Sequence, residues 1–257
     1  SIRIIAGIPG GTNLPLYDAL SQNHQIYHIL ARHEQGAGFI AQGMARISGK
    51  PAVCFATSGP GATNILTSIA DAKLDSVPII CITGQVPSTL IGTDAFQEVD
   101  IYGMSIPITK HNFLVRTAAD LLDVIPESFR IATSGRPGPV LIDVPKDIQN
   151  QMVEFDQWPE PGQPDPLPAV DLVKVGHAAR LINQAHRPIL CLGGGAVQSD
   201  VATLVAHLAE KASIPIAMTL MGLGAIPADH PRSIGMLGMH AARYTNLALE
   251  ECDLLIA

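Results

Sequence analysis

Clusters of basic residues are missing from this sequence, and charge of either sign is scarce. Only 15% of its 257 residues are charged, and 16 Lys and Arg stand against 23 Asp and Glu, for a formal net charge of −7. Proteins bind nucleic acids by neutralising backbone phosphates with cations. This composition therefore predicts no nucleic-acid partner and favours a small-molecule ligand.

Long apolar runs and paired cysteines are missing as well. No run approaches the ~18 to 20 apolar residues that span a bilayer, and residues 1–20 lack the features of a signal peptide. Cys54, Cys81, Cys191 and Cys252 form no CxxC pair, and three of them stand in aliphatic runs. We expect reduced core thiols, no metal held by cysteine, no membrane contact and a cytoplasmic location, with a mature organellar chain as the alternative.

Short aliphatic runs alternate with longer segments of helical period, and 47% of the residues are hydrophobic. This alternation is typical of an α/β fold in which helices cover a doubly wound parallel sheet. The predicted strands are Ile4–Ala6, Ile26–Leu30, Ala52–Ala56, Ile79–Thr83, Ile108–His111 and Val140–Val144. The predicted helices lie near residues 13–22, 35–48, 62–74 and 118–134. Together they predict a first domain over residues 1–150.

A proline-rich stretch follows, "DQWPEPGQPDPLPA" at residues 156–169. Proline neither continues a helix nor donates to a sheet, so we predict a semi-rigid linker over residues 151–169. The alternation then restarts and predicts a second, Rossmann-like domain over residues 170–257. Its predicted elements are helices 171–185, 200–212 and 241–251 and strands 188–193, 214–219 and 253–257. Because the chain lacks an initiator Met and stops within the apolar run "CDLLIA", we expect it to be a piece of a longer protein.

Glu34 is the first candidate for chemistry. It opens the helix in "RHEQGAGFIAQGMARISGK" (residues 32–50), whose small residues let another backbone or a flat ligand approach closely. The plain alternative is an acid that only favours the positive end of a helix. A carboxylate held at such a close contact is also a candidate for handling a proton.

Three loops are further candidates. "ATSGPGATN" (residues 56–64) joins a strand to a helix, where glycines and free N–H groups form either a ligand pocket or only a tight turn. In "CITGQVPSTLIGTDAFQEVD" (residues 81–100), Phe96, Gln97 and Gln85 offer an aromatic wall and amides to a substrate, with ordinary loop packing as the alternative. "GGGAV" (residues 193–197) is similar to a dinucleotide-binding turn but lacks its third glycine.

Seven motifs in order resemble the catalytic subunits of the acetolactate synthase family, which are thiamine-diphosphate enzymes. They are "GIPGGTNLPLYDAL", "RHEQGAGFIAQGMAR", "ATSGPGATN", "ITGQVPSTLIGTDAFQEVD", "ITKHN", "SGRPGPVLIDVPKD" and "GMLGMH". The resemblance covers essentially the whole chain. It implies a pyrimidine-binding first domain and a central FAD-binding domain, here truncated, in which FAD is structural.

The implied reaction is the decarboxylation of pyruvate and its carboligation to a second 2-keto acid, a step in branched-chain amino-acid biosynthesis. The family's Mg²⁺ and diphosphate ligands belong to a third domain outside these residues, so the isolated chain should be inactive. The resemblance also implies a homodimer and a regulatory small subunit. The alternatives are a sister enzyme (pyruvate oxidase, sulfoacetaldehyde acetyltransferase or oxalyl-CoA decarboxylase) or an inactive flavin- or nucleotide-binding module.

The resemblance assigns roles residue by residue. Glu34 is implied to bind the N1′ nitrogen of the aminopyrimidine and to activate the cofactor, and Gln97 to position the keto acid. Gly10, Gly11, Thr12, Pro60 and Asn64 are implied to line the pyrimidine side, and Phe96 and Lys146 the substrate pocket. Arg136, Gly193, Gly194, Gly195, Thr219, Leu220, Met239 and His240 are implied to contact FAD. Ala241 departs from the glycine that often follows this histidine in the family, which puts the FAD contact there in doubt.

Overall fold

The computed structural model describes residues 2–199 and 201–257, which divide into two compact units, one up to Leu167 and one from Pro168 onward. Two sequence predictions touch residues outside this range. These are the start of the first domain at Ser1 and the start of the predicted helix 200–212.

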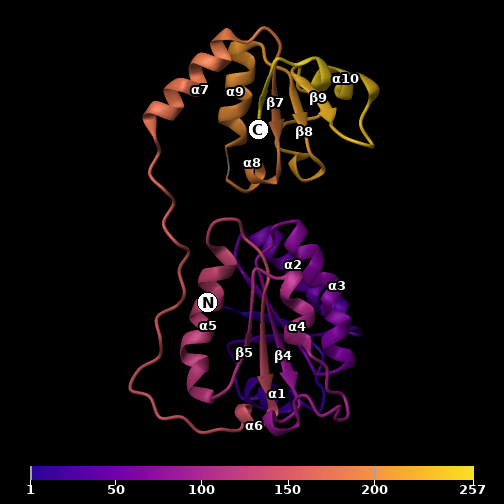
Figure 1. The fold of residues 1–257 in the computed structure, drawn as a ribbon, viewed down its shortest axis with the longest axis vertical. Coiled ribbons are helices and arrows are strands. Elements are labelled where there is room, and N and C mark those ends of the chain that lie inside the picture. Colours follow the sequence, from indigo (N-terminus) through magenta and orange to yellow (C-terminus); the bar gives the residue numbers. More distant parts are fainter. Residues whose placement is uncertain (1, 200) are drawn as a thin grey trace. The chain divides into compact units, whose positions relative to one another are not determined.

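The first unit is built on a six-stranded parallel sheet with the order β2-β1-β3-β4-β6-β5 (Figure 1). The strands are β1 (Ile4–Gly7), β2 (Tyr27–Leu30), β3 (Ala52–Ala56), β4 (Ile79–Gln85), β5 (His111–Leu114) and β6 (Val140–Pro145). The helices are α1 (Leu14–Ser21), α2 (Glu34–Ser48), α3 (Pro60–Leu74), α4 (Ile101–Ser105), α5 (Leu121–Thr133) and α6 (Lys146–Gln149). The predicted α/β class and parallel sheet are confirmed.

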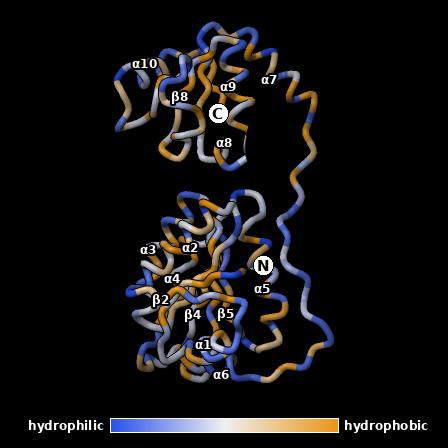
Figure 2. Tube along the Cα trace, turned by 180° about the vertical axis from the view of Figure 1, so that it is seen from behind, coloured by the Kyte–Doolittle hydropathy of each residue, from blue (hydrophilic) through white to orange (hydrophobic). Residues whose placement is uncertain are grey.

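Helices cover both faces of this sheet, with α2, α3 and α4 on one face and α1, α5 and α6 on the other. The central strands β3 and β6 are buried along their whole length, which explains why they read as continuous apolar runs. Figure 2 shows the hydrophobic colouring concentrated along such strands in the interior of the unit. The central strands therefore form an apolar interior, and polar groups that could meet a ligand lie mainly in the loops at the ends of the sheet.

Two local predictions in this unit were incomplete or wrong. The strand predicted at residues 108–111 instead begins at His111, because Ile106–Ile108 form a 3₁₀ turn around Pro107. The short helix α6 was not predicted, since four residues carry too little periodicity to be recognised.

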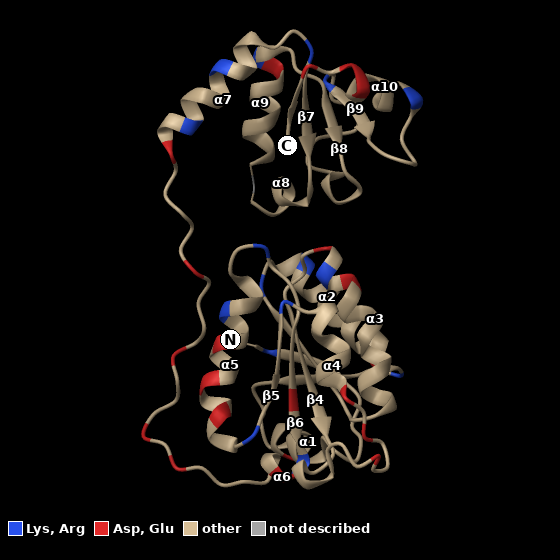
Figure 3. Ribbon diagram, viewed as in Figure 1, with Lys and Arg blue, Asp and Glu red and all other residues tan. Residues whose placement is uncertain are grey.

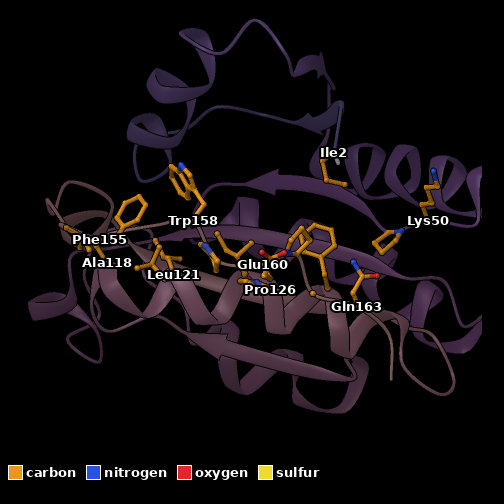
Figure 4. A pocket seen from close by; sticks show the side chains of 17 residues that line it. Ile2, Lys50, Ala118, Leu121, Pro126, Phe155, Trp158, Glu160 and Gln163 are labelled. Atoms are coloured by element: carbon orange, nitrogen blue, oxygen red, sulfur yellow. The ribbon is translucent and has the colours of Figure 1, made fainter. Parts of the chain in front are cut away.

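Part of the proline-rich segment is in contact with helix α5 of the first unit. Asp165 forms an ion pair with Arg130 of α5 at 2.7 Å, and Gly162 packs so closely on α5 that a Cβ there would lie 1.8 Å from the Pro126 carbonyl oxygen. Phe155 and Trp158 extend over the same helix and help to enclose an apolar cavity of about 690 Å³ (Figure 4). We call residues 153–165 the strap, because they run along α5 instead of only spacing two domains.

The second unit has a four-stranded parallel sheet with the order β10-β7-β8-β9. Its strands are β7 (Pro188–Leu192), β8 (Ile216–Met218), β9 (Ser233–Met236) and β10 (Leu254–Ile256), and its α-helices are α7 (Leu172–Gln184), α8 (Gly194–Gln198), α9 (Ala202–Ala212) and α10 (Arg243–Glu251). The sequence did not predict α8 or β9, both short and glycine-containing. No helix in the described part of either unit is long and apolar enough to cross a membrane.

Candidate functional site

The candidate site lies at the carboxyl ends of β1, β2 and β3. The chain passes from β1 outward to β2 and then returns to β3 on the other side of β1, so the strand order reverses between β1 and β3. In open parallel sheets, ligands bind in the crevice at such a reversal. The loops that follow β1 and β3 are the predicted pyrimidine-side loops.

These two loops are joined by a small polar network. The Thr12 and Thr57 hydroxyls are 2.9 Å apart, and the Ser58 N–H donates to Thr12 Oγ1 at 2.9 Å. Gly10 packs against Thr57 so tightly that a Cβ would lie 2.6 Å from the threonine side chain. The predicted residues Gly10, Gly11 and Thr12 are thus held beside the start of α3, which opens with Pro60.

Glu34 begins α2, as predicted, with His33 as the N-cap residue. The carboxylate is half-buried, and the Asn64 side-chain amide donates to its Oε2 at 3.0 Å. Its Oε1 lies beside Gly61 of α3, where a Cβ would be 3.3 Å away. One oxygen is therefore oriented by an amide, while the other stands next to a backbone that carries no side chain.

Gln97 is brought to the same turn by backbone packing. It has a positive φ of 59°, and Gly59 (φ 55°) lies so close that a Cβ there would be 2.7 Å from the Gln97 carbonyl oxygen. Phe96 is 89% exposed. The structure thus places the loop that holds Phe96 and Gln97 next to the "SGPG" turn, through the contact between Gln97 and Gly59. Gln97 and Gly59 are therefore distant in the sequence but in contact in the fold.

Gln85, by contrast, is not available to a ligand. It is only 3% exposed, and its amide nitrogen donates to Asp143 Oδ2 at 3.0 Å and to the Val99 carbonyl oxygen at 2.9 Å. The expectation that Gln85 offers an amide to a substrate is therefore wrong, because both hydrogens of that amide are used inside the protein.

Tyr17 of α1 lies behind the site. A Cβ on Gly7 would be 2.4 Å from the Tyr17 hydroxyl oxygen, so the hydroxyl lies directly against β1. Burial raises the pKa of Tyr17 above its usual value, and Cys54 and the Glu34 carboxylate raise it further. The phenol therefore stays neutral near Glu34.

One predicted residue of the first unit, Arg136, lies away from Glu34, and another, Lys146, follows the carboxyl end of β6. Arg136 donates to Ser76 Oγ at 2.7 Å and to the Leu74 carbonyl oxygen at 2.9 Å, at the far end of α3. Fifteen helical residues at about 1.5 Å each separate the two ends of α3 by roughly 22 Å. Lys146 opens α6, and the neighbouring Asp147 accepts from the Ser88 N–H at 2.8 Å.

The predicted FAD residues of the second unit gather at the carboxyl edge of its own sheet. Gly193–Gly195 follow β7, Thr219 and Leu220 follow β8, and Met239 and His240 follow β9. The Thr219 N–H donates to the Leu192 carbonyl oxygen at 2.9 Å, and a Cβ on Gly194 would lie 3.1 Å from Met221. The turns after β7 and β8 are therefore side by side, and Met239 is 89% exposed.

Sequence reasoning missed several residues that build the first site. Thr57 stands inside a motif that was singled out, but its link to Thr12 needs the fold. Gln149 was also missed, although its amide donates to the Thr12 carbonyl oxygen at 2.8 Å. Asp143 gave a visible signal, since it is an acid inside the apolar run of β6.

Metal binding has no visible candidate in this part of the chain. Within residues 2–199 and 201–257, no group of three or more His, Cys, Asp and Glu side chains is arranged to hold a metal ion. The cavity under the strap contains none of the predicted site residues in its wall.

Comparison with known proteins gives two matches to family models along the chain. Residues 1–104 match the N-terminal TPP binding domain of thiamine pyrophosphate enzymes, and residues 175–257 match the central domain of the same enzymes. Over 255 residues the chain is 62% identical to the acetolactate synthase isozyme 1 large subunit of Escherichia coli, covering 99% of this chain and 45% of that protein.

Two further relatives carry similar names. A probable acetolactate synthase large subunit of Methanocaldococcus jannaschii is 48% identical over 262 residues, which cover 100% of this chain and 44% of that protein. The acetolactate synthase large subunit of Corynebacterium glutamicum is 48% identical over 258 residues, covering 99% and 41%. The chain thus spans less than half the length of these relatives.

Proposed function

The chain belongs to the thiamine pyrophosphate enzyme family, and on that premise we propose that it is part of an acetolactate synthase catalytic subunit. The proposed reaction is decarboxylation of pyruvate and carboligation to a second 2-keto acid, which gives 2-acetolactate or 2-aceto-2-hydroxybutyrate. The similarity to large subunits across distant organisms supports this reaction over those of the sister enzymes.

The observation that carries the proposal is the setting of Glu34 at the reversal of strand order. Its half-buried carboxylate is oriented by Asn64 and faces the bare backbone of Gly61, so a flat heterocycle can approach the free oxygen. The donor set therefore fits an aminopyrimidine. Thiamine diphosphate, when bound, supplies the carbon nucleophile of the reaction.

The residues of this chain would act on that group in defined ways. Glu34 would hold a proton between its free oxygen and the N1′ ring nitrogen, and Asn64 would keep the carboxylate aimed. The Gly10–Thr12 loop would line the ring, while Gln97 would position the keto acid and Phe96 and Lys146 would border it. These roles come from the resemblance, and the shared location of the loops supports them.

The second unit is proposed to contact FAD as a structural element through the turns after β7, β8 and β9. Arg136 is proposed, from the resemblance alone, to contact FAD. The Mg²⁺ and diphosphate ligands would come from the rest of the protein, and a second catalytic subunit and a regulatory small subunit are the proposed partners.

The test is an assay of the full-length protein for acetolactate formation from pyruvate. Glu34→Gln should lower the rate by ~10² to 10⁴-fold, the usual value of a general acid–base group, with the fold unchanged by circular dichroism. Glu250→Gln, on the exposed end of α10, is the matched control and should keep full activity.

Three results would count against the proposal. A loss of less than about tenfold for Glu34→Gln would remove its assigned role. Acetyl-phosphate or peroxide production without acetolactate would point to a sister enzyme. Turnover by residues 1–257 alone would contradict the expectation that the diphosphate ligands lie elsewhere.

A further inference from the structure

Asp143 is a buried carboxylate that the proposed mechanism does not use. We propose that Asp143, acting through Gln85, is a positioning residue that fixes the 86–100 loop and so places Phe96 and Gln97 at the substrate. This inference rests on the proposed function, because that function is what gives the loop a substrate to meet.

The setting of Asp143 is unusual for an acid. It lies within β6 at 1% exposure and is the one Asp, Glu, Lys or Arg that is fully buried among the described residues; Figure 3 shows a red band within that strand. Thr83 donates to its Oδ1 at 2.7 Å and Gln85 to its Oδ2 at 3.0 Å, both from β4. Both carboxylate oxygens are thus bound by neutral donors of the neighbouring strand.

No cation offsets this buried charge in the described contacts. Burial raises the pKa of Asp143 to about 7, although the hydrogen bonds from Thr83 and Gln85 oppose the rise, and Asp100 adds to it. An isolated buried acid of this kind is costly to keep.

The hydrogen bond with Asp143 holds the side chain of Gln85 in place. Its Oε1 accepts from the Val86 N–H at 2.9 Å, which fixes the orientation of the amide. The amide nitrogen then has two hydrogens, of which one goes to Asp143 and the other to the Val99 carbonyl oxygen at 2.9 Å. Asp143 therefore aims the second hydrogen of Gln85 at the loop.

Hydrogen bonds within the 86–100 loop connect its residues to one another, so holding Val99 also restrains its neighbours. The Glu98 carboxylate accepts from the N–H groups of Gly92 and Asp94 at 3.1 Å each, which closes residues 92–98 on themselves. On the other side, Asp100 caps α4 by accepting from the Gly103 N–H at 2.9 Å. Val99 joins the two parts. Its carbonyl, which also accepts from the Ile101 N–H at 2.8 Å, ties the end of the loop to β4 through Gln85, while Ser88 ties the start of the loop to Asp147.

Gln97 lies two residues before this tie and packs on Gly59 with a positive φ. Its backbone is therefore held from one side by the "SGPG" turn and from the other by Val99. The Val99 side chain packs on the core as well, so losing the bond from Gln85 would loosen the position of Gln97 without freeing it. A shift of about 1 Å in a positioning group can cost on the order of 10²-fold in rate.

The test uses the full-length protein with its cofactors bound. Gln85→Met keeps the length of the side chain but removes all three hydrogen bonds of the amide, those with Asp143, Val99 and Val86. We expect faster amide hydrogen exchange in the 86–100 loop and a kcat/KM for pyruvate lower by about 10 to 100-fold. The affinity for thiamine diphosphate, measured by titration, should stay as in the unmodified protein, because the pyrimidine-side loops are untouched.

Thr83→Val is the matched control. It removes one hydrogen bond from the same carboxylate but leaves the link between Gln85 and Val99, so exchange in the loop and kcat/KM should stay close to the unmodified values. Asp143→Asn is the conservative variant. Its amide can donate to Thr83 and still accept from Gln85, so it should retain the anchor, whereas Asp143→Val should behave like Gln85→Met.

The outcomes separate the two proposals. If the unmodified protein makes no acetolactate, the proposed function fails, while hydrogen exchange still tests the anchor. If it is active and Gln85→Met leaves either loop exchange or kcat/KM unchanged, the positioning role is overturned. It is also overturned if Thr83→Val is as damaging as Gln85→Met, since the effect would then belong to the sheet.

If Gln85→Met or Asp143→Val fails to fold, a double variant that carries both Gln85→Glu and Asp143→Asn takes its place. The exchanged partners keep a hydrogen bond between β4 and β6, but the introduced carboxylate has no hydrogen for the Val99 carbonyl. Faster loop exchange and a lower kcat/KM are expected here too. Unchanged values in this pair would overturn the proposal.

Discussion

Gly38 of α2 marks the closest approach of the two helices that frame Glu34. A Cβ at this position would lie 1.9 Å from Ser68 Oγ and 2.6 Å from Ser68 Cβ, on α3. The hydroxyl can rotate away, but the Cβ of Ser68 is fixed by its backbone. Gly38→Ala must therefore push α2 and α3 apart.

The expected cost follows from two opposing effects. Overpacking a tight core costs ~1 to 3 kcal/mol, and a contact fixed by backbone belongs at the upper end of that range. Alanine offsets about 1 kcal/mol of this cost, because its helix propensity is higher than that of glycine. We expect Gly38→Ala to lower the free energy of unfolding by about 2 kcal/mol in total.

Urea unfolding of the variant measures this cost, and Gly43→Ala on the same helix is the control. Nothing lies within 4 Å of a Cβ at Gly43, so that change should stabilise the protein by about 1 kcal/mol. Adding Ser68→Gly to Gly38→Ala removes the clash and should restore part of the lost stability.

The same substitution should also affect the candidate site. Because Asn64 of α3 donates to Glu34 of α2, separating the helices should weaken that bond and lower the activity of the full-length protein. If Gly38→Ala is as stable as Gly43→Ala, the close contact does not set the spacing of the helices, and the argument is refuted.

Two further predictions concern charge. The pKa of Asp143 is raised from 3.8 to about 7, so its contribution to stability is complete below pH ~4 and is lost as the pH rises toward 7. Urea unfolding should show Asp143→Asn gaining stability relative to the unmodified protein over that interval, and parallel pH curves would contradict this. Arg130→Gln removes the half-exposed ion pairs with Asp165 and Glu127, which contribute little to the free energy of unfolding, yet it should loosen the strap. Limited proteolysis and the fluorescence of Trp158 report on the strap, and an unchanged cleavage rate would show that Arg130 does not hold it.

The local sequence pattern was sufficient to predict an element wherever that segment alone determines its secondary structure. The apolar runs of β3 and β6 predicted buried strands, because a strand covered on both faces needs apolar side chains throughout. The start of α2 at Glu34 was likewise predicted, and His33 caps it. The strand β5 was misplaced because the isoleucines of the Pro107 turn lie just before it and have the β-branched character of a strand.

The alternation of strands and helices, the α/β class and the resemblance to a known family could all be recognised from the amino-acid sequence. Three contacts of the folded chain could not: Thr12 meets Thr57, Asn64 orients Glu34, and the Gln85 amide is used up between Asp143 and Val99. The physical reason is that periodicity records which face of an element is buried, whereas contacts between loops depend on the order in which strands pair. That order brings together side chains that no local pattern relates.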